Sequence, residues 1–166
     1  MQQAIRLRHV GWSILAAGLI LAAAIGAQAA DDDRQKQTVA VTIFGIHATN
    51  AEKPHVDPAL AAIAEQLKRY KFNSFRVVAK ETRSVALGKQ WELPMLEGYC
   101  RRVLPTEAHE DRVKMEVAWV QYVEDEKGKR KTRIHERMVM FIGKGKYLLT
   151  AVKLKEGALV GALAVQ

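Results

Sequence analysis

The sequence of 166 residues contains a single cysteine, Cys100. A chain with one cysteine forms no internal disulfide, and it offers none of the paired-cysteine patterns that bind zinc. Cysteine packs as a small hydrophobic residue, so we expect Cys100 to be a buried, inert thiol. Pairing between two chains is the alternative.

The chain also lacks the common catalytic motifs. After residue 30 the only serines are Ser74 and Ser84, and neither lies in a G-x-S-x-G or S-x-x-K pattern. The segments 128–132 and 143–146 are rich in glycine and lysine, but neither matches G-x-x-x-x-G-K-[ST] or opens a helix. We interpret both as turns. The sequence therefore predicts no cofactor and favours a protein that is not an enzyme.

Metal chemistry has only one candidate set. No two histidines form a close H-x-x-x-H pair. His47, His55 and Asp57 all border one loop, and they define the alternative hypothesis of a small metal-dependent hydrolase. Their spacing does not match a known ligand pattern, so the main prediction contains no metal site.

Long apolar runs are confined to the N-terminus. Residues 1–30 contain two arginines and no acid, then an alanine-rich apolar run over 11–27, and end in the small-x-small sequence Ala27-Gln28-Ala29-Ala30. This order is typical of a cleaved signal peptide, and an uncleaved anchor is the alternative. We expect a signal peptide at 1–30, a flexible polar tail at 31–37 and a single globular domain at 38–166. The mature protein would be periplasmic or secreted, with no transmembrane span after cleavage.

Hydrophobic patterning predicts many strands and one helix. Residues 38–48 and 158–165 are apolar on both faces, which indicates two internal strands. Asp57-Pro58 opens a helix over about 58–70, whose apolar residues recur at helical spacing. The other segments with strand composition are 72–80, 82–87, 90–95, 99–104, 113–123, 130–142 and 147–154.

This order of elements predicts an α+β fold. We expect one twisted, mostly antiparallel sheet of six to eight strands, with the single helix covering one face. Curling of the sheet into a sandwich or half-barrel is the alternative.

Three stretches carry a resemblance to a known group of proteins. They are VTIFGIHATN, then VDPALAAIAEQLKRY with its sequel KFNSFRVV, and the ending LLTAVKLKEGALVGALAV. With these stretches the chain resembles a group of small exported bacterial proteins of unassigned function. The resemblance implies the fold and export, and it carries over no site residues.

A row of basic residues is the most informative feature of the charge pattern. Residues 31–166 contain 24 basic and 18 acidic side chains. Within them, a row at period two consists of Lys129, Lys131, Arg133, His135 and Arg137. On a strand these five side chains would share one face, and from Lys131 to Arg137 the row would span ~20 Å. Such a row suits an anionic partner, but a solvated face or charges that protect an edge strand would give the same pattern.

Three hypotheses follow from these observations. The first is a non-enzymatic binding or assembly module of the cell envelope, whose basic row meets an anionic envelope polymer, lipid headgroups or an acidic protein. We expect no nucleic acid, because the row contains no aromatic residues for base stacking. The second is the metal-dependent hydrolase. The third is a subunit whose exposed sheet edge pairs with a partner or with itself.

Overall fold

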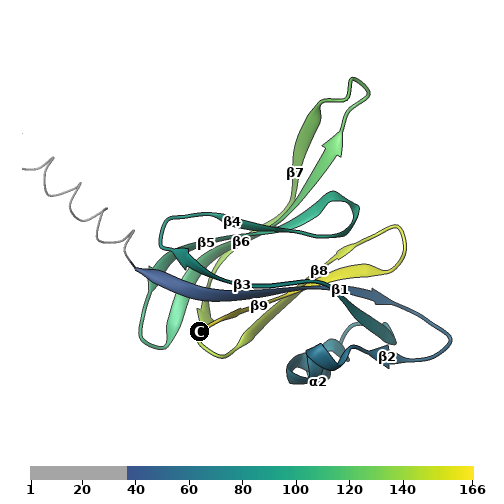
Figure 1. Ribbon diagram of the computed structural model, residues 1–166, viewed down its shortest axis with the longest axis horizontal. Helices are drawn as coiled ribbons and strands as arrows, with labels where there is room; N and C mark the ends of the chain where they lie inside the picture. Colours follow the sequence, from purple (N-terminus) through teal and green to yellow (C-terminus); the bar gives the residue numbers. More distant parts are fainter. Residues whose placement is uncertain (1–36) are drawn as a thin grey trace, which may run out of the picture. The chain divides into compact units, whose positions relative to one another are not determined.

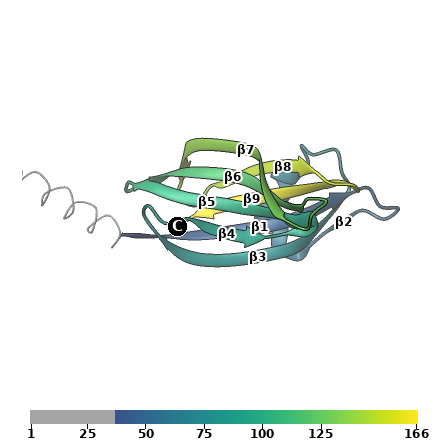
Figure 2. The same cartoon turned by 90° about the horizontal axis from the view of Figure 1, so that it is seen from above.

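The computed structural model describes residues 37–166, which form two β-sheets packed face to face (Figures 1 and 2). Sheet A has the order β2-β3-β1-β9-β8 and sheet B the order β4-β5-β6-β7. Sheet A consists of β1 (Thr38–Thr49), β2 (His55–Val56), β3 (Ser74–Ala86), β8 (Tyr147–Lys153) and β9 (Ala158–Val165). Sheet B consists of β4 (Trp91–Pro94), β5 (Tyr99–Ala108), β6 (Arg112–Glu124) and β7 (Arg130–Gly143). All neighbours are antiparallel except β2 and β3.

The prediction of one sheet with six to eight strands is therefore wrong. Residues 37–166 are β-rich with a single short helix, and their strands divide into sheets of five and four. The reason is the apolar inner face of sheet B, on which Val103, Val113 and Val117 are fully buried. One short helix could not cover these residues as well as sheet A, and folding one sheet over the other buries them against Val41 and Ile43.

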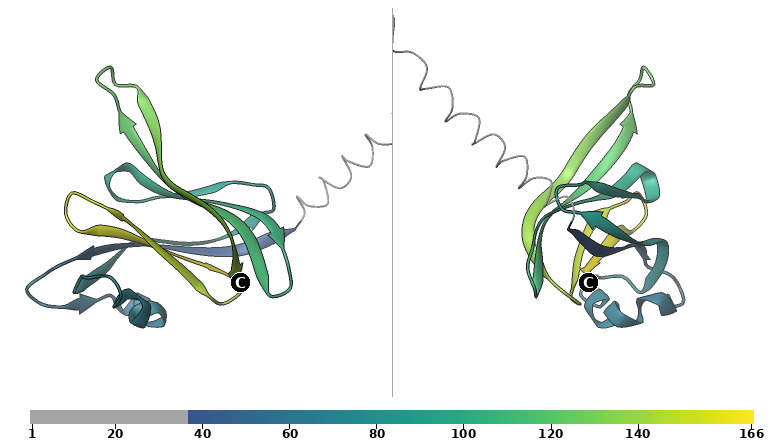
Figure 3. Two further views of the ribbon diagram at one scale, coloured as in Figure 1. Left: turned by 180° about the vertical axis from the view of Figure 1, so that it is seen from behind. Right: turned by 60° about the vertical axis from the view of Figure 1, so that its left-hand side comes forward.

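The two strands that are apolar on both faces are internal, as predicted. β1 lies between β3 and β9, and β9 lies between β1 and β8. Ile43 and Leu163 pack between the sheets, while Ile46 and Val160 pack on the opposite face of sheet A with the helical segment. Figure 3 shows this segment on the side of sheet A that faces away from sheet B.

The helical segment is shorter and less regular than predicted. It consists of a 3-10 helix, η1 (Pro58–Ile63), and one α-helical turn, α2 (Ala64–Leu67). Asp57 caps its start as expected, because the Asp57 carboxylate accepts a hydrogen bond of 2.9 Å from the backbone N–H of Ala59. Leu60, Ile63 and Leu67 supply the buried face. The chain must return to β3 at Ser74, so the helix ends before residue 70.

Two paired glycines shape the interior of the sandwich. Gly45 on β1 is the cross-strand partner of Gly161 on β9. A Cβ at Gly45 would lie 2.9 Å from the sulfur of Met95, and one at Gly161 would lie 2.7 Å from the ring of Trp119. The two glycines thus leave the space into which Met95 and Trp119 of the opposite layer pack.

The predicted strand boundaries were wrong in two places. Segments 72–80 and 82–87 form one continuous strand, β3. The segment at 99–104 continues past Pro105 to Ala108, because a register irregularity between Pro105 and Glu107 accommodates the proline.

The predicted signal peptide at 1–30 and most of the tail at 31–37 lie outside the described residues. Within residues 37–166, no helix is long and apolar enough to cross a membrane.

Candidate functional site

The hairpin formed by β6 and β7 projects beyond the two packed sheets (Figures 1 and 3). We call residues 121–135 the hairpin arm. On the β7 side every residue from Arg130 to Arg137 is exposed. Because neither face of this part of β7 is covered among residues 37–166, the strand presents side chains on both sides, and within these residues one of its backbone edges is unpaired.

A β-bulge divides the basic row. Trp119 pairs with Glu136, but the next residue, Val120, pairs with Ile134, so His135 is the extra residue on β7. Cross-strand partners share a face, so Lys131 and Arg133 lie on the face of Trp119, which is turned toward sheet A. Arg137 pairs with Ala118 and lies on the outer face. The prediction that all five side chains share one face is therefore wrong, since one inserted residue exchanges the faces.

The five predicted residues also differ in their partners. Arg137 forms an ion pair of 3.1 Å with Glu116, and Lys131 lies 3.3 Å from Asp125. His135 shares a hydrogen bond of 3.0 Å with Gln121, and its ring packs against Tyr99. Lys129 and Arg133 have no acidic partner within 4.0 Å among the described residues, as is also true of the neighbouring Lys127.

The tip of the arm is a tightly bonded turn. The Asp125 carboxylate accepts hydrogen bonds from the backbone N–H groups of Lys127 (3.0 Å) and Lys129 (2.9 Å). These bonds, that to Lys129 foremost, lower the pKa of Asp125, with a further contribution from Lys131. Gly128 adopts the left-handed conformation that closes the turn. The turn therefore holds the backbone at Lys127 and Lys129 in a fixed conformation.

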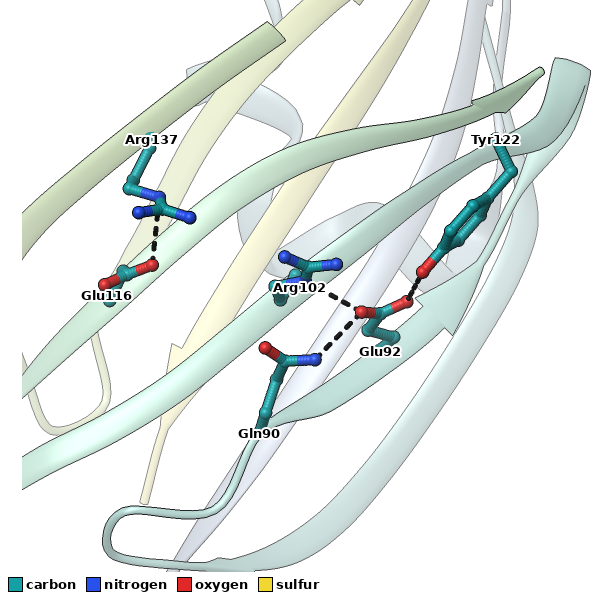
Figure 4. A network of polar contacts seen from close by, with 6 residues as sticks. All are labelled: Gln90, Glu92, Arg102, Glu116, Tyr122 and Arg137. Carbon is teal, nitrogen blue, oxygen red and sulfur yellow. Dashed lines mark hydrogen bonds and ion pairs between the residues drawn. The ribbon is translucent and has the colours of Figure 1, made fainter. Parts of the chain in front are cut away.

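A polar network covers the outer face of sheet B at the base of the arm (Figure 4). One oxygen of Glu92 accepts hydrogen bonds from Arg102 (2.7 Å) and Gln90 (3.0 Å), and the other accepts from the Tyr122 hydroxyl (2.7 Å). The hydrogen bond to Glu92, followed by burial, raises the pKa of Tyr122. The guanidinium of Arg130 lies 3.8 Å from the centre of the Tyr122 ring and extends the network into the arm. The network fixes the arm to β4 and β5.

Cys100 is buried on this outer face, as predicted. Burial, and next the negative charge of Glu92, raise the pKa of its thiol. A thiol held in its protonated form is a poor nucleophile, so the geometry gives Cys100 a packing role.

A buried arginine lies between the sheets. Arg101 is fully buried, and its guanidinium nitrogens have no hydrogen-bond partner among residues 37–166. Its guanidinium carbon lies 4.7 Å from the centre of the Trp119 ring. Burial lowers the pKa of Arg101 to about 10, against the opposing charge of Glu136. The sequence did not reveal this residue, because an arginine next to Arg102 on a strand is typical of an exposed charge.

The free edge of β7 carries an exposed apolar patch that the sequence analysis also missed. Ile134, Val139 and Phe141 are each about half exposed, and their register places all three on the outer face. Two cations lie over the Phe141 ring, Arg112 at 4.7 Å and Lys114 at 5.9 Å. We call Ile134, Val139 and Phe141 the edge patch. Alternating apolar residues normally signal a buried face, so the sequence did not distinguish this patch from core.

The alternative metal set is not brought together. The Asp57 carboxylate accepts hydrogen bonds from Ala59 and Val77, whereas His47 bonds the backbone carbonyl of Glu156 at 3.0 Å. His55 is exposed on β2, two strands away from His47. Among the described residues, no three potential ligands lie close enough to hold a metal ion. His47 instead lines an open groove of about 290 Å³ beside the β8–β9 turn.

Comparison with known proteins adds no assignment. No family model matches this chain, and no curated protein or solved structure shows significant similarity to it.

Proposed function

We propose that this protein is an exported, non-enzymatic binding or assembly module of the cell envelope, and that its hairpin arm binds an anionic partner. One observation supports this most strongly. The arm projects from the sandwich, and from Lys127 to Arg133 it carries five basic residues and no acidic residue.

The cations of the arm are available for a partner. Lys127, Lys129 and Arg133 are exposed, and among the described residues no carboxylate lies within 4.0 Å of their charged nitrogens. A charge that is already paired in the protein contributes little to a second partner, whereas an unpaired exposed cation gains the full attraction. The arm therefore favours binding through Lys127, Lys129 and Arg133, with little contribution from Arg137.

The arm is also preorganised for binding. The Asp125 turn and the stacking of Arg130 on Tyr122 hold its tip and its base. A fixed array of charges loses less conformational entropy on binding than a flexible tail with the same composition. This argues against the reading of the basic row as an ordinary solvated segment.

The test compares two variants with equal loss of charge. In the first, Lys127, Lys129 and Arg133 are replaced by glutamine. In the control, the replaced residues are Lys71, Arg83 and Lys89, which are exposed elsewhere on the domain. Binding is measured at low salt to dextran sulfate and, separately, to vesicles that contain phosphatidylglycerol.

Each cation near an anionic surface contributes about 1 kcal/mol. We therefore expect the arm variant to bind roughly 100-fold more weakly and the control variant to bind almost as well as the native protein. Equal binding by the two variants to both probes would show that net charge, and not the arm, determines the association.

A further inference from the structure

The edge of β7 has the geometry of a strand-addition site, and this inference rests on the proposed function. β7 is the last strand of sheet B and has 14 residues. Among the described residues, only one of its two edges is paired, the edge next to β6. A long edge strand with exposed apolar side chains readily pairs with another chain. The question is which part of the edge is open to pairing, and to what kind of partner.

The features that normally protect an edge strand lie at one end of β7. The bulge at His135 and the charges Arg130, Lys131 and Arg133 precede Glu136. From Met138 to Gly143 the strand has no charged residue, no proline and no bulge. It alternates Val139 and Phe141 on the outer face with half-buried methionines on the inner face. The second half of β7 is thus the unprotected half.

The ladder itself shows which backbone groups face outward. The N–H of Lys144 donates to the carbonyl of Asp111 at 2.9 Å, so these two residues form a hydrogen-bonded pair. Hydrogen-bonded and non-bonded pairs alternate along an antiparallel ladder. Counting along the register, Phe141, Val139 and Arg137 belong to non-bonded pairs. Their N–H and C=O groups therefore point away from β6, toward the free edge.

The charge around this edge selects the kind of partner. From Asp125 to Lys146, a segment that covers β7 and its two flanking turns, there are eight basic residues and three acidic residues. Arg112, Lys114 and Arg137 are paired with Asp111, Glu107 and Glu116. Lys144 and Lys146 are exposed and have no acidic partner within 4.0 Å among residues 37–166. We infer that the second half of β7 binds an extended acidic segment of a partner protein, which adds to sheet B as a fifth strand next to β7. Its acidic side chains would lie near the unpaired cations at the two ends of this half, Arg133 and the pair Lys144 and Lys146, and its backbone would bond the outward groups of Val139 and Phe141.

The register gives a matched pair of variants. Val139→Pro removes an outward N–H without removing a bond to β6, and proline is tolerated at such edge positions. Val139→Thr keeps the N–H and a β-branched side chain. The probe is a synthetic octapeptide of alternating valine and glutamate, and its control is the same peptide N-methylated at alternate residues. Because the methyl groups are on the peptide, this control does not depend on the folding of a variant.

We expect the octapeptide to bind the native protein and Val139→Thr alike, and Val139→Pro at least ten-fold more weakly. The N-methylated peptide should bind the native protein and Val139→Thr at least ten-fold more weakly than the unmodified octapeptide does. The amides of Val139 and Phe141 should exchange with solvent quickly in the free protein and slowly in the complex. Unchanged exchange at these two amides, or equal binding of both peptides, would overturn the inference.

Two further measurements separate this inference from the proposed function. Dextran sulfate should bind Val139→Pro as well as the native protein, since the arm is intact. If the arm binds dextran sulfate as proposed but Val139→Pro binds the octapeptide as well as the native protein does, strand addition alone is refuted. If the variant with Lys127, Lys129 and Arg133 replaced by glutamine binds dextran sulfate as well as the control variant does, the proposed function is refuted. A native dimer in sedimentation equilibrium that Val139→Pro converts to monomer would show that a second copy occupies the edge, which would overturn the acidic partner.

Discussion

Arg101 stacks on Trp119 in the interior of the sandwich, directly across the β5–β6 ladder from it. This contact offsets only part of the cost of burying a charge, because the guanidinium makes no hydrogen bond within the described residues. We therefore predict that Arg101→Met, which keeps the volume and removes the charge, raises the free energy of unfolding by ~1–3 kcal/mol at pH 7. Urea unfolding measures this change. A loss of stability would contradict the prediction and show that the guanidinium has a strong partner.

The pH dependence of this effect has a definite sign. Burial lowers the pKa of Arg101 to about 10 in the folded protein, well below its value in the unfolded chain. Between these two values the unfolded chain binds the extra proton, so raising the pH stabilises the folded native protein. The advantage of Arg101→Met should be constant below pH ~9 and shrink above pH ~10. Comparing the two proteins cancels the titration of lysines and tyrosines.

A methyl group at Gly161 should be poorly tolerated. In Gly161→Ala the new Cβ would lie 2.7 Å from the ring of Trp119, which is itself fully buried and bonded to Thr150. We expect a loss of ~1–3 kcal/mol in the free energy of unfolding. Gly143→Ala is the control, because its Cβ would meet the flexible Lys146 side chain at 3.4 Å and the Asp111 carbonyl at 3.9 Å, both ordinary contacts. Equal effects of the two changes in thermal unfolding would argue against tight packing around Trp119.

The carboxylate of Glu92 holds the polar network at the base of the arm. Its hydrogen bond is the main cause that raises the pKa of Tyr122, so Glu92→Gln should lower that pKa toward the ordinary tyrosine value. Loss of the charged bond to Arg102 should also reduce stability by ~1–2 kcal/mol. Ultraviolet titration compared with Tyr122→Phe isolates the phenol. A titration curve that does not move in Glu92→Gln would refute the bond between Glu92 and Tyr122.

The turn at the tip of the arm should loosen in acid. The backbone hydrogen bond from Lys129, with that from Lys127 and the contact with the Lys131 ammonium, lowers the folded pKa of Asp125 below the ordinary value of an aspartate. A carboxylate with a lowered folded pKa contributes stability above its unfolded pKa, and this contribution disappears as the pH falls through the folded value. Amide exchange at Lys127 and Lys129 should therefore accelerate on acidification. Asp125→Asn keeps an acceptor oxygen and should show less dependence on pH.

The sequence predicted the elements better than their assembly. β1 and β9 are internal because residues such as Ile43 and Ile46 need cover on opposite faces, and this pattern is visible in the chain. The division into two sheets depends on which apolar faces meet across the core, and strand patterns do not encode that choice. The helix is shorter than predicted because the start of β3 limits its length.

The candidate site shows the same division between local and nonlocal information. The sequence revealed the basic segment, but the prediction that its side chains share one face of the strand was wrong. The alternation of charges does not reveal the bulge at His135. Arg101 and Phe141 were missed for opposite reasons. A charged residue became buried and an aromatic residue stayed exposed, and both outcomes follow from strand order, which composition does not reveal.

The most direct test of the central claim is a map of amide chemical shifts in the native protein as dextran sulfate is added at low salt. Binding through the hairpin arm predicts that the largest shifts fall at Lys127, Lys129 and Arg133, and that they disappear at high salt because exposed charges are then screened. Shifts centred on Lys71, Arg83 or Lys89, or spread evenly over the exposed lysines, would contradict the account.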